Sequence, residues 1–389
     1  MARKSRILLL QFANPAGYPP LEHASRILAD KGWEVLFLGV ASEETAALTF
    51  PPHPSIRTRT LQRPRRGLLL KLNYAVFLVW ALALCLVWRP RLVYASDPIV
   101  CPAALALRAL AGCRVLYHEH DALPAGSDRL PERLLQAARR RLGRAAEICV
   151  VPQQRRLEVF IEETGRRGPI FCVWNCPRLE EVAPPRSEAG TRPMSFYFHG
   201  SISAIKLPET VLDALAQASP DATLTVVGYE TVGSRGYMRA FLERAQRLGL
   251  SQRVRYPGAL ARSDMLRRAH QADVGLGFIP QVPGNINMTH MTGASNKPFD
   301  YLAVGMMPLV SDLAEWRDLY VGPGYARACD PGEVESLAAA LTWCVANPHK
   351  VRAMGEAGRQ RILRDWNYEA GFAPVAQFLD ISKSDARDS

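Results

Sequence analysis

The sequence lacks several patterns that mark common classes of protein. Its eight cysteines include no CxxC pair, and Cys172 and Cys176 have no matching pair elsewhere, so we expect reduced thiols and no metal site. No GxGxxG motif follows the first predicted strand, which argues against a dinucleotide-dependent dehydrogenase. Aromatic and basic residues do not alternate on a recognisable platform. Nucleic-acid binding therefore has only the net charge in its favour.

Long hydrophobic runs are also missing. The apolar run 7–10 is too short for a secretory signal and predicts a first buried strand. The uncharged stretch 74–88 falls short of the roughly 20 residues that span a bilayer. Basic residues flank this stretch within 57–91, so we expect it to lie on an anionic membrane surface. A buried helix that covers the first sheet is an equal alternative, and the two are compatible.

Length, composition and charge set broad limits. A chain of 389 residues is too long for one compact core and predicts two domains. With 48% hydrophobic and 22% charged residues, it is globular rather than disordered. The formal net charge of +11 favours acidic partners, which include nucleotide phosphates, nucleic acid and anionic lipid head groups.

Apolar runs alternate with helical patterns along most of the chain. The runs that predict buried strands are 7–11, 33–38, 92–95, 115–117, 148–151, 195–198, 223–227, 254–256, 274–278 and 307–310. This rhythm predicts parallel sheets with helices on both faces, and ligand loops at the carboxyl ends of the strands. The alternation of strand and helix patterns is interrupted at 178–192. This stretch is rich in Pro, Glu and Arg and predicts an interdomain linker.

The most informative stretch is 295–312, which predicts a loop, a short helix, a glycine stop and a buried strand. Ser295 or Asn296 can cap the helix. The free N–H groups of its first turn, with Lys297 beside them, form a place for an anion. Asp300 lies one turn further in. These groups could hold a nucleoside diphosphate and a sugar hydroxyl together, and an ordinary strand–helix connection is the alternative.

Five motifs occur in order along nearly the whole chain. They are the Gly17 loop, Tyr117-His118-Glu119-His120-Asp121, Val173-Trp174-Asn175-Cys176-Pro177, Phe198-His199-Gly200-Ser201 with Lys206, and Asn296-Lys297-Pro298-Phe299-Asp300-Tyr301. In this order and spacing, the chain resembles the retaining, nucleotide-sugar-dependent glycosyltransferases of the GT4 group. The resemblance implies the α/β GT-B fold: two Rossmann-like doubly wound domains facing a central cleft, with a C-terminal helix returning to the N-terminal domain.

The same resemblance implies domain limits and an activity. We expect an acceptor-side domain at 1–180 with the docking segment 57–91, a linker at 181–192, a nucleotide-sugar-binding domain at 193–365, and a crossover helix and tail at 366–389. The implied activity is hexosyltransferase-like transfer from a nucleotide sugar to a glycan or lipid-linked acceptor, with retention, in surface polysaccharide or glycolipid synthesis. No cofactor or metal is expected. The implied location is the cytoplasmic face of the cell membrane.

Cations and amides are expected to hold the donor diphosphate. The resemblance implies that Lys206 reaches a phosphate while the amides at Gly200 contact another oxygen. The family has a second cation where this chain has Ser201, and Lys297 is the expected substitute. Further expected contacts to the donor come from Gly17, Gly228, Tyr229, Ala259, Ser295, Asn296 and Phe299.

The expected sugar contacts depart from the family pattern. Asp300 stands where the family has a glutamate that accepts hydrogen bonds from the ribose hydroxyls. The position of a second family glutamate falls on Thr292, which carries no charge. The donor sugar is expected to be held instead by loop amides at 293–295, or by Asn285 or Asn287.

The predicted catalytic group in the first half of the chain is His120. It matches the family histidine that faces the transferred sugar and hydrogen-bonds a sugar hydroxyl. His118 is the neighbouring alternative, and Glu119 could act on the acceptor hydroxyl. The leaving phosphate is the expected base, so no protein nucleophile is expected. Two rival functions remain open: a catalytically weak GT-B scaffold that binds a partner or glycan, and a nucleotide-sugar epimerase.

Overall fold

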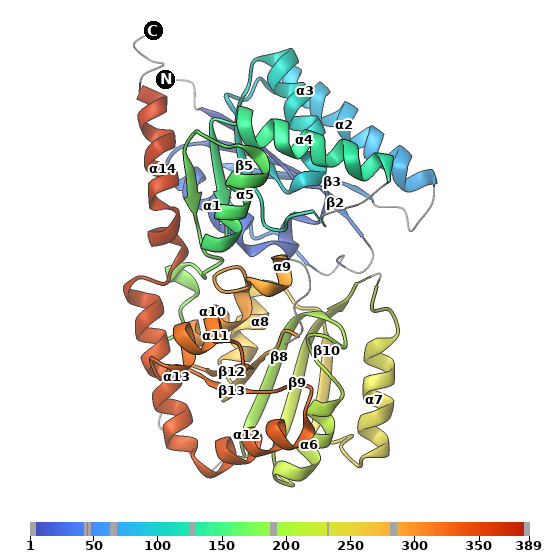
Figure 1. Cartoon of the computed structure of the whole chain (residues 1–389), viewed down its shortest axis with the longest axis vertical. Helices are drawn as coiled ribbons and strands as arrows, with labels where there is room; N and C mark the ends of the chain where they lie inside the picture. Colours follow the sequence, from blue (N-terminus) through green and yellow to red (C-terminus); the bar gives the residue numbers. More distant parts are fainter. Residues whose placement is uncertain are drawn as a thin grey trace. The chain divides into compact units, whose positions relative to one another are not determined.

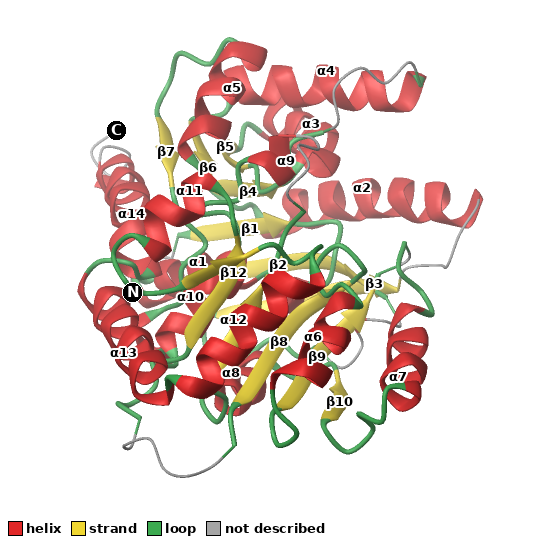
Figure 2. Ribbon diagram, turned by 60° about the horizontal axis from the view of Figure 1, so that its bottom comes forward, coloured by secondary structure: helices red, strands yellow, loops and turns green. Residues whose placement is uncertain are grey.

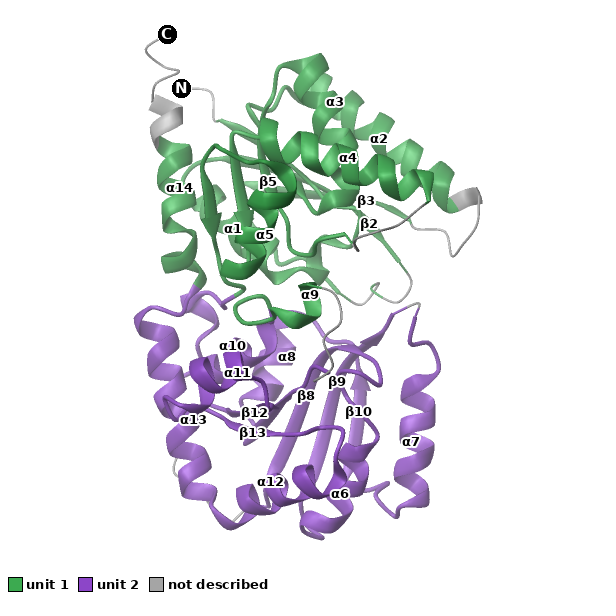
Figure 3. Ribbon diagram, viewed as in Figure 1, with its two compact units in different colours: residues 1–175, 285–294, 368–389 green, residues 176–284, 295–367 purple. Residues whose placement is uncertain are grey.

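The computed structural model describes residues 5–42, 45, 48–62, 68–123, 129–186, 193–231, 233–280 and 286–384. The chain forms two compact units. Unit 1 contains Met1–Asn175, Asn285–Ala294 and Tyr368–Ser389, and unit 2 contains Cys176–Gly284 and Ser295–Asn367 (Figure 3). Residues 187–192 of the predicted linker and 63–67 of the predicted docking segment lie outside the described residues.

Unit 1 is built on a parallel sheet with strand order β3-β2-β1-β4-β5-β6-β7 in its described part. The strands are β1 (Arg6–Leu10), β2 (Glu34–Ala41), β3 (Ile56–Gln62), β4 (Leu92–Ser96), β5 (Arg114–His118), β6 (Ile148–Val151) and β7 (Ile170–Cys172). The helices are η1 (Pro15–Gly17), α1 (Pro19–Asp30), α2 (Leu68–Trp88), η3 (Pro98–Val100), α3 (Cys101–Ala111), α4 (Leu130–Ala145), α5 (Gln154–Thr164), α9 (Ile286–Thr289) and α14 (Tyr368–Ser384).

Both faces of this sheet are covered, which explains why successive inner residues of its central strands are apolar, such as Ile7 to Leu10 of β1. Along β1, Leu8 and Leu10 enter the core shared with α2 to α5, whereas Ile7 and Leu9 enter the core shared with α1 and α14. Helices α2, α3 and α4 lie side by side over the first of these faces (Figure 1). The predicted return of the last helix is confirmed, because Phe372 of α14 is buried in the second core.

Unit 2 is built on a second parallel sheet, with order β10-β9-β8-β11-β12-β13 in the described residues. The strands are β8 (Ser195–Ile202), β9 (Thr223–Glu230), β10 (Val254–Gly258), β11 (Val274–Gly277), β12 (Met307–Ser311) and β13 (Arg327–Cys329). The helices are η4 (Leu179–Glu181), α6 (Thr210–Ala218), α7 (Tyr237–Arg247), α8 (Arg262–Ala269), α10 (Asn296–Ala303), α11 (Ala314–Trp316), η5 (Arg317–Val321), α12 (Val334–Ala346) and α13 (Pro348–Arg364).

Helices cover both faces of the unit 2 sheet as well. Helices α6 and α12 pack side by side on one face (Figure 2), with Leu212 and Leu341 in their shared core. On the other face, Leu266 of α8 and Tyr301 of α10 pack against Tyr197 of β8. The predicted α/β fold with two doubly wound sheets is thus confirmed.

The strand orders locate a ligand site in each unit. Doubly wound sheets bind ligands outside the carboxyl ends of their strands, where the strand order reverses. That reversal lies between β1 and β4 in unit 1 and between β8 and β11 in unit 2. The loops that follow these strands are therefore the places to look for function.

Helix α2 corrects an expectation about length. It has 21 residues because it begins at Leu68, and the part Leu70–Trp88 is long and apolar enough, by length and composition alone, to cross a membrane. In the structure one side of the helix packs on unit 1, where Phe77, Ala81 and Cys85 are buried at four-residue spacing. The other side is also apolar but open: Val87 is 81% exposed. The helix thus covers the sheet, as one alternative predicted, and leaves an exposed apolar face.

Candidate functional site

In unit 2, the carboxyl ends of β8 and β9 approach each other closely at two glycines. Gly200 and Gly228 are register partners on these neighbouring strands, and their φ angles are +107° and +149°. A Cβ atom at Gly228 would lie 1.9 Å from the carbonyl oxygen of Gly200, so no larger residue fits there. At this position both strands therefore present backbone rather than side chains, as is typical where a chain must approach a ligand.

The loop after β8 carries the first cation of the site. Lys206 Nζ donates a hydrogen bond to Ser201 Oγ at 2.6 Å. Ser201 lies opposite Tyr229 in the register of β8 and β9. Since β8 borders the reversal of strand order, this loop lies at the predicted ligand end of the sheet.

Helix α10 brings the second cation, from the loop that follows β11 on the other side of the reversal. Ser295 precedes the helix with extended backbone, and its side chain makes no capping hydrogen bond. Lys297 Nζ lies 5.3 Å from the ring centroid of Phe198. The same Nζ lies 3.6 Å from the position that a Cβ atom would take at Gly200. The first turn of α10 therefore meets the end of β8 at Gly200.

The surroundings of Lys297 favour an anion. Burial, together with the positive charge of Lys206, lowers the pKa of Lys297 to about 7. Within the described residues, Lys297 Nζ makes no hydrogen bond. Two amines that repel each other at the N-terminus of a helix gain from an anion between them, and a diphosphate carries the charge and the oxygens to serve both.

Asp300 is placed differently from the predicted ribose contact. Its carboxylate is 1% exposed, and both oxygens are engaged by the protein. Arg262 donates to Oδ1 at 2.8 Å and His199 Nε2 lies 3.2 Å from Oδ2, while Arg262 also pairs with Glu181. Burial acts to raise the pKa of Asp300, but Arg262 and His199 hold it below its ordinary value. The ionised carboxylate thus ties α10 to β8 and α8.

The other predicted donor contacts in unit 2 fall into two groups. Phe299 is fully buried, and its ring packs against Tyr320 and Trp366 at 5.7 Å, so its side chain anchors α10 in the core. By contrast, Tyr229, Ala259 and Asn296 are partly exposed at the carboxyl end of the sheet. The structure therefore gathers a smaller set at one place: Gly200, Ser201, Lys206, Gly228, Tyr229 and Lys297.

In unit 1, the rings of His118 and His120 lie against each other, tilted by 33°, where β5 ends and its loop begins. Their ring centroids are 3.8 Å apart, and the hydroxyl of Tyr94 lies 2.7 Å from His118 Nδ1. Burial and the nearby Arg156 lower the pKa of His120 to about 3, and burial together with the neighbouring His120 lowers the pKa of His118 well below its ordinary value. Both Nε2 atoms are buried without a hydrogen-bond partner in the described part of the chain. A neutral imidazole with one unpaired nitrogen suits a sugar hydroxyl.

The Gly17 loop lies in the same part of unit 1. Gly17 ends η1 directly after β1, and its N–H donates to the carbonyl of Asn14 at 2.9 Å. The ring of the next residue, Tyr18, lies 6.0 Å from the ring of His120. The loop that contains Gly17 and the loop that contains His120 are therefore neighbours at the carboxyl end of the unit 1 sheet.

Asp97 fixes the loop that carries His120, and the sequence analysis did not single it out. It has a positive φ of 69°, which is rare for a residue with a side chain. Its carboxylate accepts hydrogen bonds from the N–H groups of His120 at 2.9 Å and Asp121 at 3.3 Å. Burial and the charge of Asp121 raise the pKa of Asp97 to about 8. The sequence signal that could have identified Asp97 is its position directly after the apolar strand β4, which borders the reversal of strand order.

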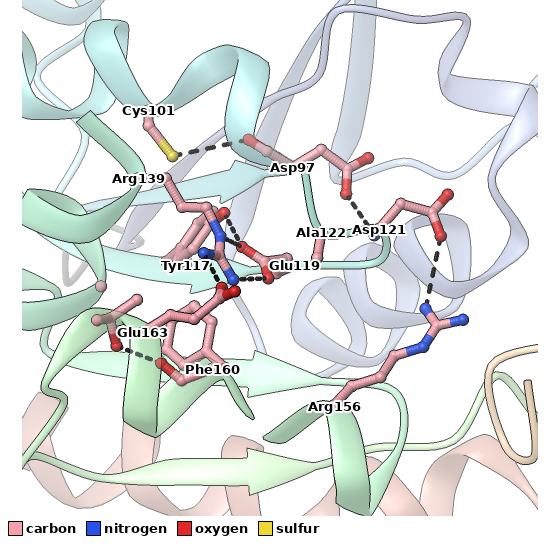
Figure 4. Close-up of polar contacts among 12 residues, drawn as sticks. Asp97, Cys101, Tyr117, Glu119, Asp121, Ala122, Arg139, Arg156, Phe160 and Glu163 are labelled. Atoms are coloured by element: carbon pink, nitrogen blue, oxygen red, sulfur yellow. Dashed lines mark hydrogen bonds and ion pairs between the residues drawn. The ribbon is translucent and has the colours of Figure 1, made fainter. Parts of the chain in front are cut away.

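The structure corrects the role considered for Glu119. Its carboxylate is 3% exposed and accepts hydrogen bonds from Arg139 at 2.5 and 2.6 Å and from the Tyr117 hydroxyl at 2.6 Å. Figure 4 shows the Arg139 guanidinium pointing at this carboxylate, away from the Asp97–Asp121 contact. Glu119 therefore joins β5 to α4, and both of its oxygens already accept hydrogen bonds within the protein.

Residues 286–294, which we call the bridging segment, belong to unit 1 although the chain on both sides belongs to unit 2 (Figure 3). Asn287 Oδ1 accepts from the N–H of Ala122 at 2.9 Å, and its Nδ2 donates to the Ala122 carbonyl at 2.8 Å. Asn175 Nδ2 donates to the carbonyl of Ala294 at 2.7 Å. The predicted grip of Asn287 on the donor sugar is thus corrected, because its amide is paired with backbone. Asn285 lies outside the described residues.

Comparison with known families matches both halves of the chain. A model described as a glycosyl transferase 4-like domain matches residues 21–176, and one described as glycosyl transferase-like matches residues 206–377. The chain belongs to the GT4-like glycosyltransferases. The predicted GT4-like glycosyltransferase family is confirmed, while retention stays a prediction. The two matched regions contain the His120 loop and the Lys206 and Lys297 site respectively.

Solved structures share the GT-B fold of this glycosyltransferase over nearly its whole length. Sucrose-phosphate synthase from Thermosynechococcus elongatus matches with a TM-score of 0.68 and 16% identity, covering 98% of this chain and 100% of that one. HepE from Anabaena, solved with UDP and glucose, matches with a TM-score of 0.69 and 18% identity, covering 97% and 100%. WaaG, a glycosyltransferase involved in lipopolysaccharide biosynthesis, matches with a TM-score of 0.69 and 14% identity, covering 96% and 99%. A search of curated proteins gives no match.

Proposed function

We propose that this glycosyltransferase moves a sugar from a nucleoside-diphosphate donor to a glycan or lipid-linked acceptor, with retention and without a metal ion. The observation that carries the proposal is that two lysines meet the last residues of β8. Lys206, from the loop after β8, contacts Ser201, and Lys297, from the first turn of α10, lies beside Gly200. Cleavage of a glycosyl–phosphate bond leaves negative charge on the diphosphate. Two amines and the amides of α10 stabilise that charge as it develops.

A uridine nucleotide is the first donor to test. HepE, which has the same fold, was solved with UDP and with UDP-glucose. In this chain Tyr229 is partly exposed next to Ser201, where a base or ribose can pack on its ring. The identity of the donor sugar stays open, because Thr292 carries no charge and the amide of Asn287 is already paired with Ala122.

In the proposed reaction, the leaving diphosphate accounts for retention. A diphosphate held by Lys206 and Lys297 can accept the proton of the acceptor hydroxyl on the face from which it departs. The new glycosidic bond then forms on that same face as the bond to phosphate breaks. His120, kept neutral by burial, donates a hydrogen bond to a hydroxyl of the transferred sugar.

The exposed face of α2 supports an acceptor at the cytoplasmic face of the cell membrane. Its open apolar residues include Leu72, Val76, Val79, Leu86 and Val87. The preceding edge strand β3 exposes Arg57 and Arg59, and the whole chain has a net charge of +11. An apolar helix face beside basic residues binds an anionic lipid surface. We therefore propose a role in the synthesis of a surface polysaccharide or glycolipid.

The test is a donor screen with product analysis. The protein is incubated with a panel of labelled nucleotide sugars and membrane lipid extract, and the product linkage is assigned by NMR. Lys206→Ala is expected to abolish transfer, whereas Lys350→Ala, at an exposed lysine of α13 in the same unit, keeps it. An inverted product would refute retention. Full transfer by Lys206→Ala would refute the diphosphate site.

One observation favours a second candidate, a GT-B protein that binds its ligand with little turnover. The buried carboxylate of Asp300 is paired with Arg262 and His199 instead of being open to a ribose. In addition, Ser201 and Thr292 stand where the family resemblance leads us to expect charged residues. This candidate predicts nucleotide binding without transfer from any donor in the same screen.

A further inference from the structure

We infer that Arg156 is a positioning residue for the transfer reaction, because one guanidinium holds the His120 loop and the bridging segment together. The inference rests on the proposed function, since it concerns where the sugar-facing group of unit 1 is held. Arg156 itself is not one of the predicted catalytic and binding residues.

The contacts of Arg156 join segments that are far apart in the sequence. The residue lies in the first turn of α5 and is 4% exposed. Its Nη1 donates to the carbonyl of His120 at 2.8 Å, and its Nε donates to the carbonyl of His290 at 2.8 Å. Its Nη2 donates to the carbonyl of Asn287. Every nitrogen of the guanidinium thus contacts either the His120 loop or the bridging segment.

The shape of the arginine side chain explains how it can do this. The guanidinium is planar and presents donors in a fixed fork, whereas a lysine ammonium is a single point that cannot reach three separated carbonyls. The two linked segments also meet directly, since the side chain of Asn287 pairs with both backbone groups of Ala122. Figure 4 shows the Arg156 side chain extending toward Asp121, which lies between His120 and Ala122.

The two ends of this arrangement carry the proposed chemistry. On one side is His120, whose Nε2 is buried and unpaired in the described residues. On the other side the bridging segment ends at Ala294, and the next residue, Ser295, directly precedes the helix that carries Lys297. Within unit 1, Arg156 therefore fixes the bridging segment against the loop of the sugar-facing histidine. A misplacement of about 1 Å in such a geometry can cost about 100-fold in rate.

A matched control exists in the same unit. Arg166 is 5% exposed and also donates to backbone carbonyls, those of Gly143, Glu147 and Pro169, but it contacts neither the His120 loop nor the bridging segment. Arg156→Lys and Arg166→Lys remove the same kind of hydrogen bonds from a buried arginine. Their comparison separates the loss of folding stability from the loss of positioning.

The experiment measures kcat, the Kd for UDP and amide hydrogen exchange for both variants, each on the full chain. For Arg156→Lys we expect kcat to fall by a factor of about 10 to 100 while the Kd for UDP changes less than about twofold. Exchange is expected to rise together in 119–123 and 286–294. Asn287→Ala, at a partly exposed position, is expected to lower kcat in the same direction by a smaller factor.

Two results would overturn the inference. One is a kcat for Arg156→Lys, per folded molecule, equal to that of Arg166→Lys. The other is a Kd for UDP that weakens by the same factor as kcat falls. If the wild-type protein neither binds UDP nor transfers a sugar, the proposed function fails instead. The exchange data then still decide whether Arg156 holds the two segments, since unchanged exchange in Arg156→Lys refutes that contact.

Discussion

The lowered pKa of Lys297 makes the affinity for a donor depend on pH in a way that can be calculated. A pKa of about 7 means that Lys297 in the free protein is mostly charged at pH 6 and mostly neutral at pH 8. A bound diphosphate restores the charged form, because it offsets the repulsion from Lys206 and replaces lost solvation. Binding above pH 7 must therefore draw in a proton.

The magnitude follows from the protonation equilibrium. Each pH unit above the pKa of the free lysine costs about 1.4 kcal/mol of binding free energy, so the Kd weakens about tenfold between pH 6 and pH 8. At pH 8, binding takes up about 0.9 proton per site. The probe is UDP-glucose, whose phosphates are both esterified, because a terminal phosphate would itself titrate near pH 6.

Isothermal titration calorimetry in buffers of different ionisation enthalpy measures the Kd and the proton uptake together. Lys297→Arg is the matched variant, since a guanidinium stays charged throughout this range. We expect it to bind UDP-glucose with the same Kd at pH 6 and pH 8 and without proton uptake. A wild-type Kd that does not change with pH, or equal pH dependence in Lys297→Arg, would refute this account of the site.

Three further predictions concern the frame of the site and the surface of unit 1. Asp300→Asn is expected to lower the free energy of unfolding by about 3 kcal/mol in urea titrations at pH 7, because Arg262 loses a buried partner. The difference in unfolding free energy between the two proteins should shrink at acid pH, where the Asp300 carboxylate, whose pKa is lowered, finally protonates. Loss of UDP affinity with unchanged stability in Asp300→Asn would instead support the ribose contact. Gly228→Ala is expected to weaken UDP binding more than about tenfold, because its Cβ collides with backbone. The control Gly249→Ala, with φ +73° and open space around it, is expected to cost only about 1 kcal/mol of stability. Similar effects of the two variants on the Kd for UDP would contradict the close packing at Gly228. Val87→Glu, at an 81% exposed position, is expected to reduce flotation with anionic vesicles and leave the melting temperature within about 2 °C; unchanged flotation would exclude α2 as the docking face.

The strands that the sequence predicted are those whose environment is simple. Central strands such as β1 and β12 are buried on both faces, so their apolar runs are unbroken. Strand β3 was missed because it lies at the sheet edge, where Arg57 and Arg59 point to solvent and break the pattern. Strands β7 and β13 have three residues each, which is too short for a period to show.

The candidate site was predictable where a motif has a fixed local geometry. Lys297 follows directly from the helix that begins at Asn296, and Lys206 from the loop after a strand. The partners of Asp300 were not predictable, because Arg262 is separated from it by 38 positions and no pattern joins them. The same holds for Asn287 and Ala122, which are separated by 165 positions. Such pairs form because of the way the chain packs, and the spacing of residues in the sequence does not predict that packing.

The central claim is that one diphosphate binds to both lysines at the carboxyl end of the unit 2 sheet. A crystal structure of the protein soaked with UDP tests it most directly. We predict phosphate oxygens within hydrogen-bond distance of Lys206 Nζ, of Lys297 Nζ and of the backbone amides at Gly200. A diphosphate bound elsewhere, with both amines left in solvent, would contradict the account.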